Sequence, residues 1–291
     1  MSSDAADPLD LPPSLAAEAF AQYQETPDSR RKALDELRQG ILKLPEADRL
    51  NDVSDANLIR FVRCRKYDVA RALATTVKLK RFYMKHATLL QGLDGESWKL
   101  LDQFQSVRIR KGLDKQSGKT ILMIRPARLM PHMTSEFKQQ HPNSLLRMNI
   151  WLMDRLSRDP DVQVNGLAAL MTCSDMGFFD MVSLANVMTM EDRKILFGHM
   201  SALGIRMKGI YVFEAPLVLK GIFALVRPFL SAKLSSRVNM LGNDYASVIP
   251  TIIGQDGFKQ LPGVYGGEGG EDIAFDRDVH DKLGVQFTWN P

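Results

Sequence analysis

The sequence lacks a long hydrophobic run. Its best candidate, residues 215–226, is interrupted by Lys220 and is shorter than the roughly 18 apolar residues that a membrane-spanning helix needs. The first fifteen residues carry Asp4, Asp7 and Asp10 where a secretory signal would have a basic segment and an apolar one. These absences lead us to expect a cytoplasmic protein.

Cysteine and histidine are also too sparse for the usual metal sites. The two cysteines, Cys64 and Cys173, form no CxxC motif and are expected as reduced thiols, and none of the five histidines stands at a ligand spacing such as HExxH. A G-x-S-x-G motif is missing, and Gly118-Lys119-Thr120 has the wrong spacing and context for a P-loop. The sequence therefore predicts no metal, no cofactor and no enzymatic activity.

The composition itself is that of an ordinary folded chain, with 45% hydrophobic and 25% charged residues. A chain of 291 residues is expected to form one large domain with a smaller unit attached, or two domains. We expect a helical N-terminal domain over 1–100 that begins with an acidic tail, a second domain over 101–270, and a polar C-terminal tail over 271–291.

Periodicity supports this division. The N-terminal part has helical patterns over 30–44, 57–64 and 69–86, with Asp55 or Ser54 and then Asp68 as N-caps. The second part alternates apolar strands (107–109, 121–124, 167–173 and 209–213) with helices (145–156, 181–201, 216–226 and 231–236), and a hairpin connection is expected over 111–119. Alternation of this kind predicts an α/β fold with a mostly parallel sheet.

Charge is distributed unevenly along the chain. Residues 193–243 contain eight basic residues and one acidic residue, Glu214, whereas the first forty residues contain eight acidic and four basic ones. Arg60, Arg63, Arg65 and Lys66 form a further basic corner. Within the basic segment, residues 216–226 are apolar almost all round, which is typical either of a core helix or of a helix that seats in an anionic lipid interface.

Five stretches resemble the CRAL-TRIO family of lipid-transfer proteins. They are DANLIRFVRCRKYD from residue 55, NG at 165, KGIYVFEAP from 208, RPFLSAKLSSRV from 227, and LPGVYGG from 261. Their order and spacing match the family, and the chain is most similar to the animal branch with tocopherol- and retinaldehyde-binding members.

This resemblance implies an N-terminal helical bundle and an α/β sandwich whose sheet floors a pocket for one hydrophobic lipid, closed by a mobile gate helix. The gate corresponds to Leu217, Val218 and Leu225, with Phe229 following it. In the tocopherol-binding member, basic residues beside the gate bind phosphoinositide phosphates. The matching positions here are Arg65, Arg206, Lys208, Lys233 and Arg237.

The expected pocket walls come from strands, one wall helix and the gate. They are Ile121 and Met123 or their neighbours Leu122 and Ile124, then Met148, Trp151 and Leu152, then Leu170, Ile210 and Val212, and finally Ile222, Phe223 and Val226. Three residues depart from the family pattern: Glu214 replaces a usual Asn, Val264 replaces a usual Glu, and Thr172 stands at or near a frequent Asp.

The function expected from the resemblance is a carrier that binds one small tocopherol- or retinoid-like lipid and exchanges it at phosphoinositide-containing membranes, with transient peripheral membrane contact and no nucleic-acid partner. Three alternatives remain open, of which an enzyme acting on the bound lipid is the weakest, because the sequence shows no nucleophile, metal site or cofactor fingerprint. The chain could carry phosphatidylinositol or phosphatidylcholine, or it could be a lipid-sensing module that recruits a protein partner through its acidic N-terminus.

Overall fold

The computed structural model describes residues 9–110, 112 and 118–270, without the side chains of residues 96 and 97. The first eight residues of the expected acidic tail, most of the expected hairpin connection over 111–119 and the expected polar tail over 271–291 lie outside the described residues.

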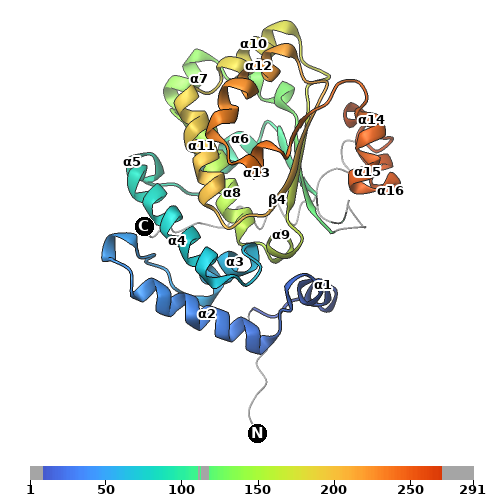
Figure 1. The fold of residues 1–291 in the computed structure, drawn as a ribbon. Coiled ribbons are helices and arrows are strands. Elements are labelled where there is room, and N and C mark those ends of the chain that lie inside the picture. Colours follow the sequence, from blue (N-terminus) through green and yellow to red (C-terminus); the bar gives the residue numbers. More distant parts are fainter. Residues whose placement is uncertain (1–8, 111, 113–117, 271–291) are drawn as a thin grey trace.

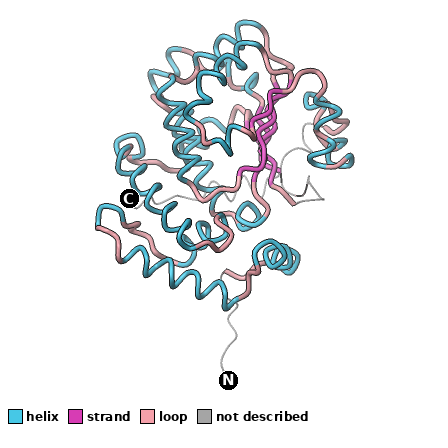
Figure 2. Tube along the Cα trace, in the orientation of Figure 1, coloured by secondary structure: helices cyan, strands magenta, loops and turns pink. Residues whose placement is uncertain are grey.

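The centre of the molecule is a five-stranded sheet in the order β1-β2-β3-β4-β5 (Figures 1 and 2). Four strands run parallel, namely β2 (Thr120–Ile124), β3 (Leu167–Thr172), β4 (Met207–Phe213) and β5 (Val238–Met240), while β1 (Val107–Arg110) pairs antiparallel with β2. The predicted α/β fold with a mostly parallel sheet is confirmed, although the short strand β5 has no counterpart in the sequence prediction.

Helices cover both faces of this sheet, which explains why its strands are apolar on both sides. One face carries α8 (Ser144–Ser157), α10 (Phe178–Asn186), α11 (Met190–Ala202) and α12 (Leu217–Val226). The other face is covered by the short helices α14 (Tyr245–Val248), α15 (Pro250–Ile253) and α16 (Gln255–Lys259), to the right of the sheet in Figure 1.

The N-terminal part is helical, as predicted. It consists of α1 (Pro13–Tyr23), α2 (Pro27–Leu42), α3 (Asp55–Cys64), α4 (Val69–Lys85), α5 (Ala87–Leu90) and α6 (Glu96–Asp102), so the expected boundary near residue 100 falls within α6. Of the two candidate caps of α3, Ser54 accepts a hydrogen bond from the N–H of Asn57, and Asp68 caps α4 through the N–H of Arg71.

The continuous helix predicted over 181–201 is in fact two helices, α10 and α11. Thr189 starts the second, because its hydroxyl accepts from the Asp192 N–H while the Asp192 carboxylate accepts from the Thr189 N–H. The remaining short elements are α7 (Ser135–Gln140), α9 (Pro160–Val164), α13 (Ala232–Ser235) and 3-10 turns at Glu46–Asp48, Pro126–Arg128, Met130–His132, Arg227–Phe229 and Gly263–Tyr265.

Buried polar contacts of Arg60 and Arg63 join α3 to the α/β part and to the other N-terminal helices. Arg60 donates to Asp154 at 2.8 Å and Arg63 donates to Glu25 at 2.6 Å, and all four side chains are almost fully buried. Arg63 also donates to Gln163 of α9 at 2.9 Å. Removing one partner of either pair would leave an uncompensated buried charge. The Arg60–Asp154 pair and the Arg63–Gln163 bond hold α3 on α8 and α9, whereas the Arg63–Glu25 pair holds α3 on the segment between α1 and α2.

No helix in the described part of the chain combines the length and apolar character that crossing a bilayer requires.

Candidate functional site

An apolar cavity of about 300 Å³ lies between the sheet and the helices on its α8 face. Its floor is made by side chains of the strands, and its walls come from α8, α10, α11 and α12. Of the residues predicted to line a pocket, the cavity contains Met148, Leu152, Ile210, Val212, Ile222, Phe223 and Val226.

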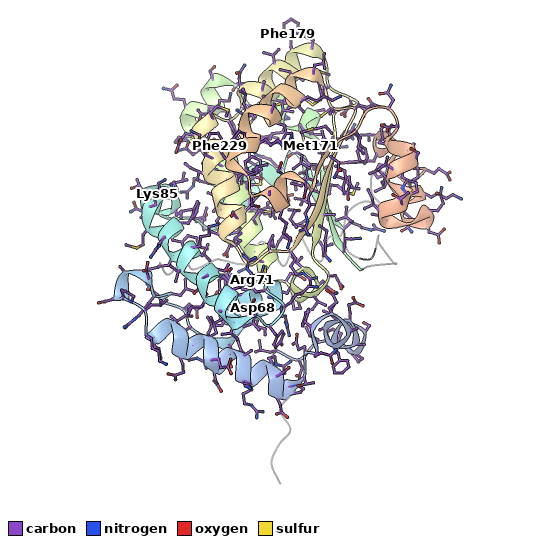
Figure 3. The ribbon with its side chains drawn as sticks, viewed as in Figure 1. Asp68, Arg71, Lys85, Met171, Phe179 and Phe229 are labelled. Atoms are coloured by element: carbon purple, nitrogen blue, oxygen red, sulfur yellow. The ribbon has the colours of Figure 1, made fainter. Side chains whose placement is uncertain are left out.

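The strand residues of β2 and β3 require a correction. Leu122 and Ile124 line the cavity, whereas Ile121 and Met123 lie on the opposite face of the sheet with Leu170, packed against α15 and α16. Successive side chains of a strand point to opposite faces, and helices bury both faces here, so hydrophobicity alone does not distinguish them. On β3 it is Met171, labelled in Figure 3, that faces the cavity.

Trp151 also departs from the prediction. It is fully buried, but its ring stacks on Trp98 of α6 with 5.8 Å between centroids, and it is not among the cavity-lining residues. Helix α8 turns a different side to the cavity, formed by Leu145, Met148, Asn149 and Leu152 at helical spacing.

The gate helix α12 is apolar on two sides. Leu219, Ile222, Phe223 and Val226 line the cavity, while Leu217 is 84% exposed and Leu225 is 64% exposed on the outside, with Val218 also exposed. Phe229, in the 3-10 turn that follows, is exposed too, with the Lys194 ammonium 4.7 Å from its ring centroid. The nearly all-round apolar pattern therefore reflects a helix with one face on the cavity and one in solvent.

Helix α10 extends this exposed apolar surface, and sequence reasoning missed it. Phe178 is 74% exposed, Phe179 is 83% exposed, and Val182 one turn later is exposed as well. Helices α10 and α12 contact each other, and Phe179 projects from the end of the molecule that they form (Figure 3). We call the group Phe178, Phe179, Val182, Leu217, Val218, Leu225 and Phe229 the lid surface.

The base of the gate contains the departures from the family pattern. Glu214 connects β4 to the gate with a φ of 48°, a left-handed conformation that is uncommon for a residue with a side chain. Burial, and then the carboxylate of Glu214, raise the pKa of Tyr245, which hydrogen-bonds to it. The hydroxyl of Thr172 donates to the carbonyl of Val264 at 2.9 Å, so two of the unusual residues contact each other.

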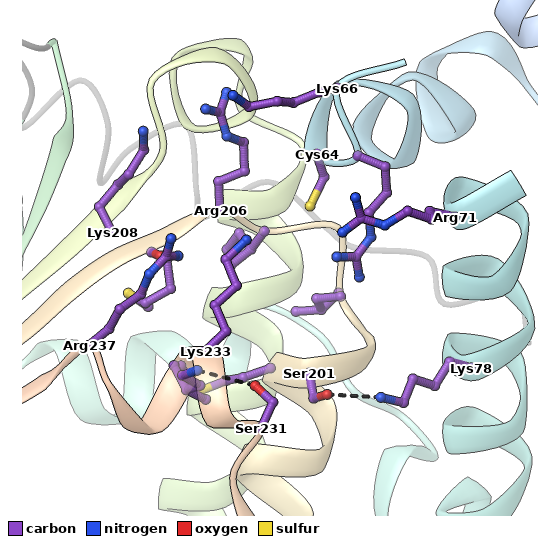
Figure 4. A pocket seen from close by; sticks show the side chains of 16 residues that line it. Cys64, Lys66, Arg71, Lys78, Ser201, Arg206, Lys208, Ser231, Lys233 and Arg237 are labelled. Carbon is purple, nitrogen blue, oxygen red and sulfur yellow. Dashed lines mark hydrogen bonds between the residues drawn. The ribbon is translucent and has the colours of Figure 1, made fainter. Parts of the chain in front are cut away.

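A second hollow, of about 550 Å³, lies where the N-terminal helices meet β4 and α13 (Figure 4). It contains all five residues predicted to bind phosphoinositide, and it adds Lys66, Arg71 and Lys78, which were not predicted. No acidic side chain lines it within the described residues. We call this site the basic pocket, and its eight cations are Arg65, Lys66, Arg71, Lys78, Arg206, Lys208, Lys233 and Arg237.

Local structure holds several of these cations in place. Arg65 donates to the Thr75 hydroxyl at 2.8 Å, Arg206 donates to Gln22 at 2.6 Å and to the Val164 carbonyl, and Arg237 donates to the Met207 carbonyl. Gly166 has a φ of 88°, and a Cβ there would come within 2.6 Å of the Arg206 carbonyl oxygen and 2.8 Å of the Lys208 side chain. A glycine is therefore required beside the pocket, which accounts for the Asn-Gly motif.

Mutual repulsion is evident at Lys208. Burial, together with the charges of Arg206, Lys119, Lys66 and Arg237, lowers its pKa to about 8. Burial and the charges of Arg237 and Arg65 also lower the pKa of Lys233. A multivalent anion bound in the pocket would reduce the repulsion among these cations. The planar guanidinium groups can donate paired hydrogen bonds to phosphate oxygens.

The basic pocket and the apolar cavity share structural elements. Leu196 and Phe197 of α11 line the cavity, and Met200 and Ser201 one turn later line the basic pocket. Arg237 lies in the basic pocket while the next residue, Val238, faces the cavity. An anion bound in the pocket would therefore contact the segment that directly follows the gate.

Within the described residues, no group of three or more His, Cys, Asp or Glu side chains is arranged to hold a metal ion.

A mostly parallel sheet that floors an apolar cavity under a two-sided apolar helix defines a protein of the lipid-binding and lipid-transfer class. The chain belongs to the CRAL/TRIO domain family, whose sequence profile matches residues 107–267.

Comparison with individual proteins agrees with this family. The chain is 27% identical over 266 residues to human alpha-tocopherol transfer protein-like, covering 90% of this chain and 72% of that protein. It is 24% identical to rat clavesin-1, covering 82% of this chain and 65% of that protein. The crystal structure of Sfh5 has the same fold, with a TM-score of 0.54 at 15% identity over 90% of this chain and 96% of that one.

Proposed function

We propose that the chain is a cytoplasmic, non-enzymatic carrier that holds one small tocopherol- or retinoid-like lipid in the apolar cavity and exchanges it at membranes containing phosphoinositides. The observation that carries the proposal is the two-sided gate. Its inner face covers the cavity, and its outer face continues into the lid surface, so the same helix can contact a ligand and a bilayer.

The size of the cavity supports a small ligand. A volume of about 300 Å³ is at the lower end of the range for pockets that hold one small molecule. A phospholipid with two acyl chains needs much more room, so the phosphatidylinositol and phosphatidylcholine alternatives would require a larger opening of the gate.

The basic pocket supports docking at anionic membranes. Its cations are attracted to lipid phosphates over about a Debye length, while the lid surface adds apolar burial. Phosphate bound at Lys233 and Arg237 would act on the chain just after the gate, and a carrier needs open and closed states that differ by only a few kcal/mol. Docking and ligand release would be coupled in this way.

Mass spectrometry of lipid extracted from protein purified without detergent tests the carrier function. We expect one isoprenoid-like molecule per chain, with denatured protein as the blank. A phospholipid in that amount would instead support the phospholipid alternative, and the absence of any lipid would contradict a carrier.

The basic pocket is tested with Lys66→Ala/Lys233→Ala, which removes two charges but spares Arg237 and its bond to the Met207 carbonyl. We expect the affinity for phosphoinositide liposomes in cosedimentation to fall about thirtyfold and to become less sensitive to salt, because each of the two cations contributes roughly 1 kcal/mol. The matched control, Lys32→Ala/Lys43→Ala, removes two exposed lysines outside the pocket. Equal losses in both variants would show that only net charge matters.

A further inference from the structure

The lining of the apolar cavity contains one charged residue within the described part of the chain, Arg193 of α11. Ser106 and Asn149 are the other polar side chains in the lining, and the rest of it is apolar. Arginine is seldom placed in such a wall, because removing its charge from water without a partner costs free energy.

The guanidinium of Arg193 is held by α10 and by the start of α11. Its Nη2 donates to the carbonyl of Ala185 at 2.6 Å, and its Nη1 is 3.7 Å from the Met190 sulfur, a weak acceptor. Leu184 and Val187, close to Ala185 in sequence, also line the cavity. A guanidinium has five donors, so these two contacts leave most of its hydrogen-bonding capacity unused.

No carboxylate of the described chain forms an ion pair with Arg193. The nearest acid in sequence, Asp192, accepts hydrogen bonds from the N–H of Thr189 at 2.8 Å and from its hydroxyl at 2.7 Å. Burial lowers the pKa of Arg193, and the charge of Asp192 opposes this only in part. A positive charge at the cavity wall therefore lacks a full counter-charge.

We propose that, among small tocopherol- or retinoid-like lipids, the cavity selects one whose chain ends in a carboxylic acid, and that this carboxylate accepts hydrogen bonds from Arg193. The inference rests on the proposed carrier function and narrows its ligand. Two oxygens of a carboxylate match parallel N–H donors of a guanidinium, and such charge-assisted bonds are stronger than neutral ones. Arg193 is only half-buried, so the acidic head keeps access to solvent while the chain lies on the apolar walls.

The test compares two probes with the same skeleton, fluorescent cis-parinaric acid and its methyl ester, titrated into the full chain. We expect the acid to bind about tenfold more tightly than the ester, since one charge-assisted interaction is lost in the ester. This ratio is measured on the unmodified protein and so does not depend on the folding of a variant. Equal affinities would overturn the inference.

Two variants test whether Arg193 causes the preference for the acid over the ester. Arg193→Gln is expected to weaken the acid about tenfold and leave the ester unchanged, whereas Lys194→Gln, which removes the neighbouring charge outside the cavity lining, should keep the preference. An unchanged acid-to-ester ratio in Arg193→Gln would overturn the role of Arg193. Binding of the ester as tightly as the acid refutes only this inference. Failure of both probes to bind also refutes this inference, and it refutes the carrier function as well where mass spectrometry finds no bound lipid.

Discussion

Neighbouring cations in the sequence have different roles in the structure. Arg60 and Arg63 are buried in ion pairs with Asp154 and Glu25, whereas Arg65 and Lys66 line the basic pocket. Lys66 lies in a turn in which both it and Tyr67 have left-handed backbone conformations, with a φ of 53° at Lys66. Two residues of the basic corner thus stabilise the fold, and the other two remain available to an anion.

Lys208 is expected to make the affinity of the basic pocket for anions depend on pH. Its pKa of about 8 is below the ordinary 10.5, so it loses its charge as the pH rises through about 8. We expect affinity for a soluble inositol bisphosphate to fall about tenfold between pH 7 and pH 9, because one charged hydrogen-bond donor is lost. Isothermal titration calorimetry across this range measures the change.

Lys208→Arg is the matched variant, because a guanidinium keeps its charge throughout that range. Its affinity should stay level from about pH 7 to about pH 9. If Lys208→Arg showed the same decline as the unmodified protein, another group would have to be responsible.

At the scale of elements, the lid surface shows how α10 and α12 act together. Both helices present large apolar side chains to solvent, and they pack against each other. Exposed apolar side chains that gather on two adjacent helices indicate a contact surface, whereas isolated ones are common on any protein. The contacts between α10 and α12, and between α12 and the 3-10 turn that carries Phe229, are what make these residues a group.

Phe178→Ser/Phe179→Ser tests this surface. Because both side chains are mostly exposed, we expect the free energy of unfolding to change by less than about 0.5 kcal/mol. Binding to liposomes should fall at least about tenfold, since burying a phenylalanine contributes roughly 1.5–3 kcal/mol.

The control for this pair is Phe20→Ser, which removes a 50%-exposed phenylalanine from α1, away from the lid surface. Its liposome binding should match that of the unmodified protein. The same loss in both variants would point to a general effect of surface hydrophobicity.

At the scale of the whole molecule, α11 connects the N-terminal helices to both sites. Its His199 is fully buried against Phe82 and Tyr83, with ring centroids 5.1 Å and 6.4 Å away. Neither imidazole nitrogen has a hydrogen-bond partner in the described part of the structure. The ring is therefore held in its neutral form at the junction of α4 and α11.

This burial makes stability depend on pH. Burial lowers the pKa of His199 from 6.5 to about 4, with the attraction of Asp154 opposing it and Arg60 and His86 adding to it. Between these values the unfolded chain binds a proton that the folded chain does not, so stability falls as the pH falls from about 6.5 to about 4. The free energy of unfolding falls by about 3 kcal/mol over this range, because each unit of pKa shift corresponds to about 1.36 kcal/mol.

We expect His199→Leu to flatten this part of the stability profile in urea unfolding measured at several pH values. Asp154, whose pKa is held below its usual range against burial by Arg60 and Arg158, should contribute only at lower pH. His132→Leu replaces an exposed histidine and should keep the original slope. A slope that survives in His199→Leu would assign the pH dependence to other groups.

The sequence by itself determined the fold class, most helices and strands and, through the family resemblance, five of the eight cations of the basic pocket. The periodicity of strands and helices is a local property of the sequence, and the order of motifs identifies the family. Secondary structure and family can therefore be predicted from the sequence alone. Arg65, Arg206, Lys208, Lys233 and Arg237 come together as the resemblance implied.

Only the tertiary structure decided which apolar residues face the cavity. Ile121 and Leu122 are adjacent and equally hydrophobic, yet one packs against α15 and the other lines the cavity, because helices cover both faces of the sheet. Likewise, no sequence pattern identified Phe178 and Phe179 as surface residues, and both are exposed in the fold. Arg193 lies at the cavity wall because α11 packs against α8 and α12, and no local sequence pattern specifies that packing.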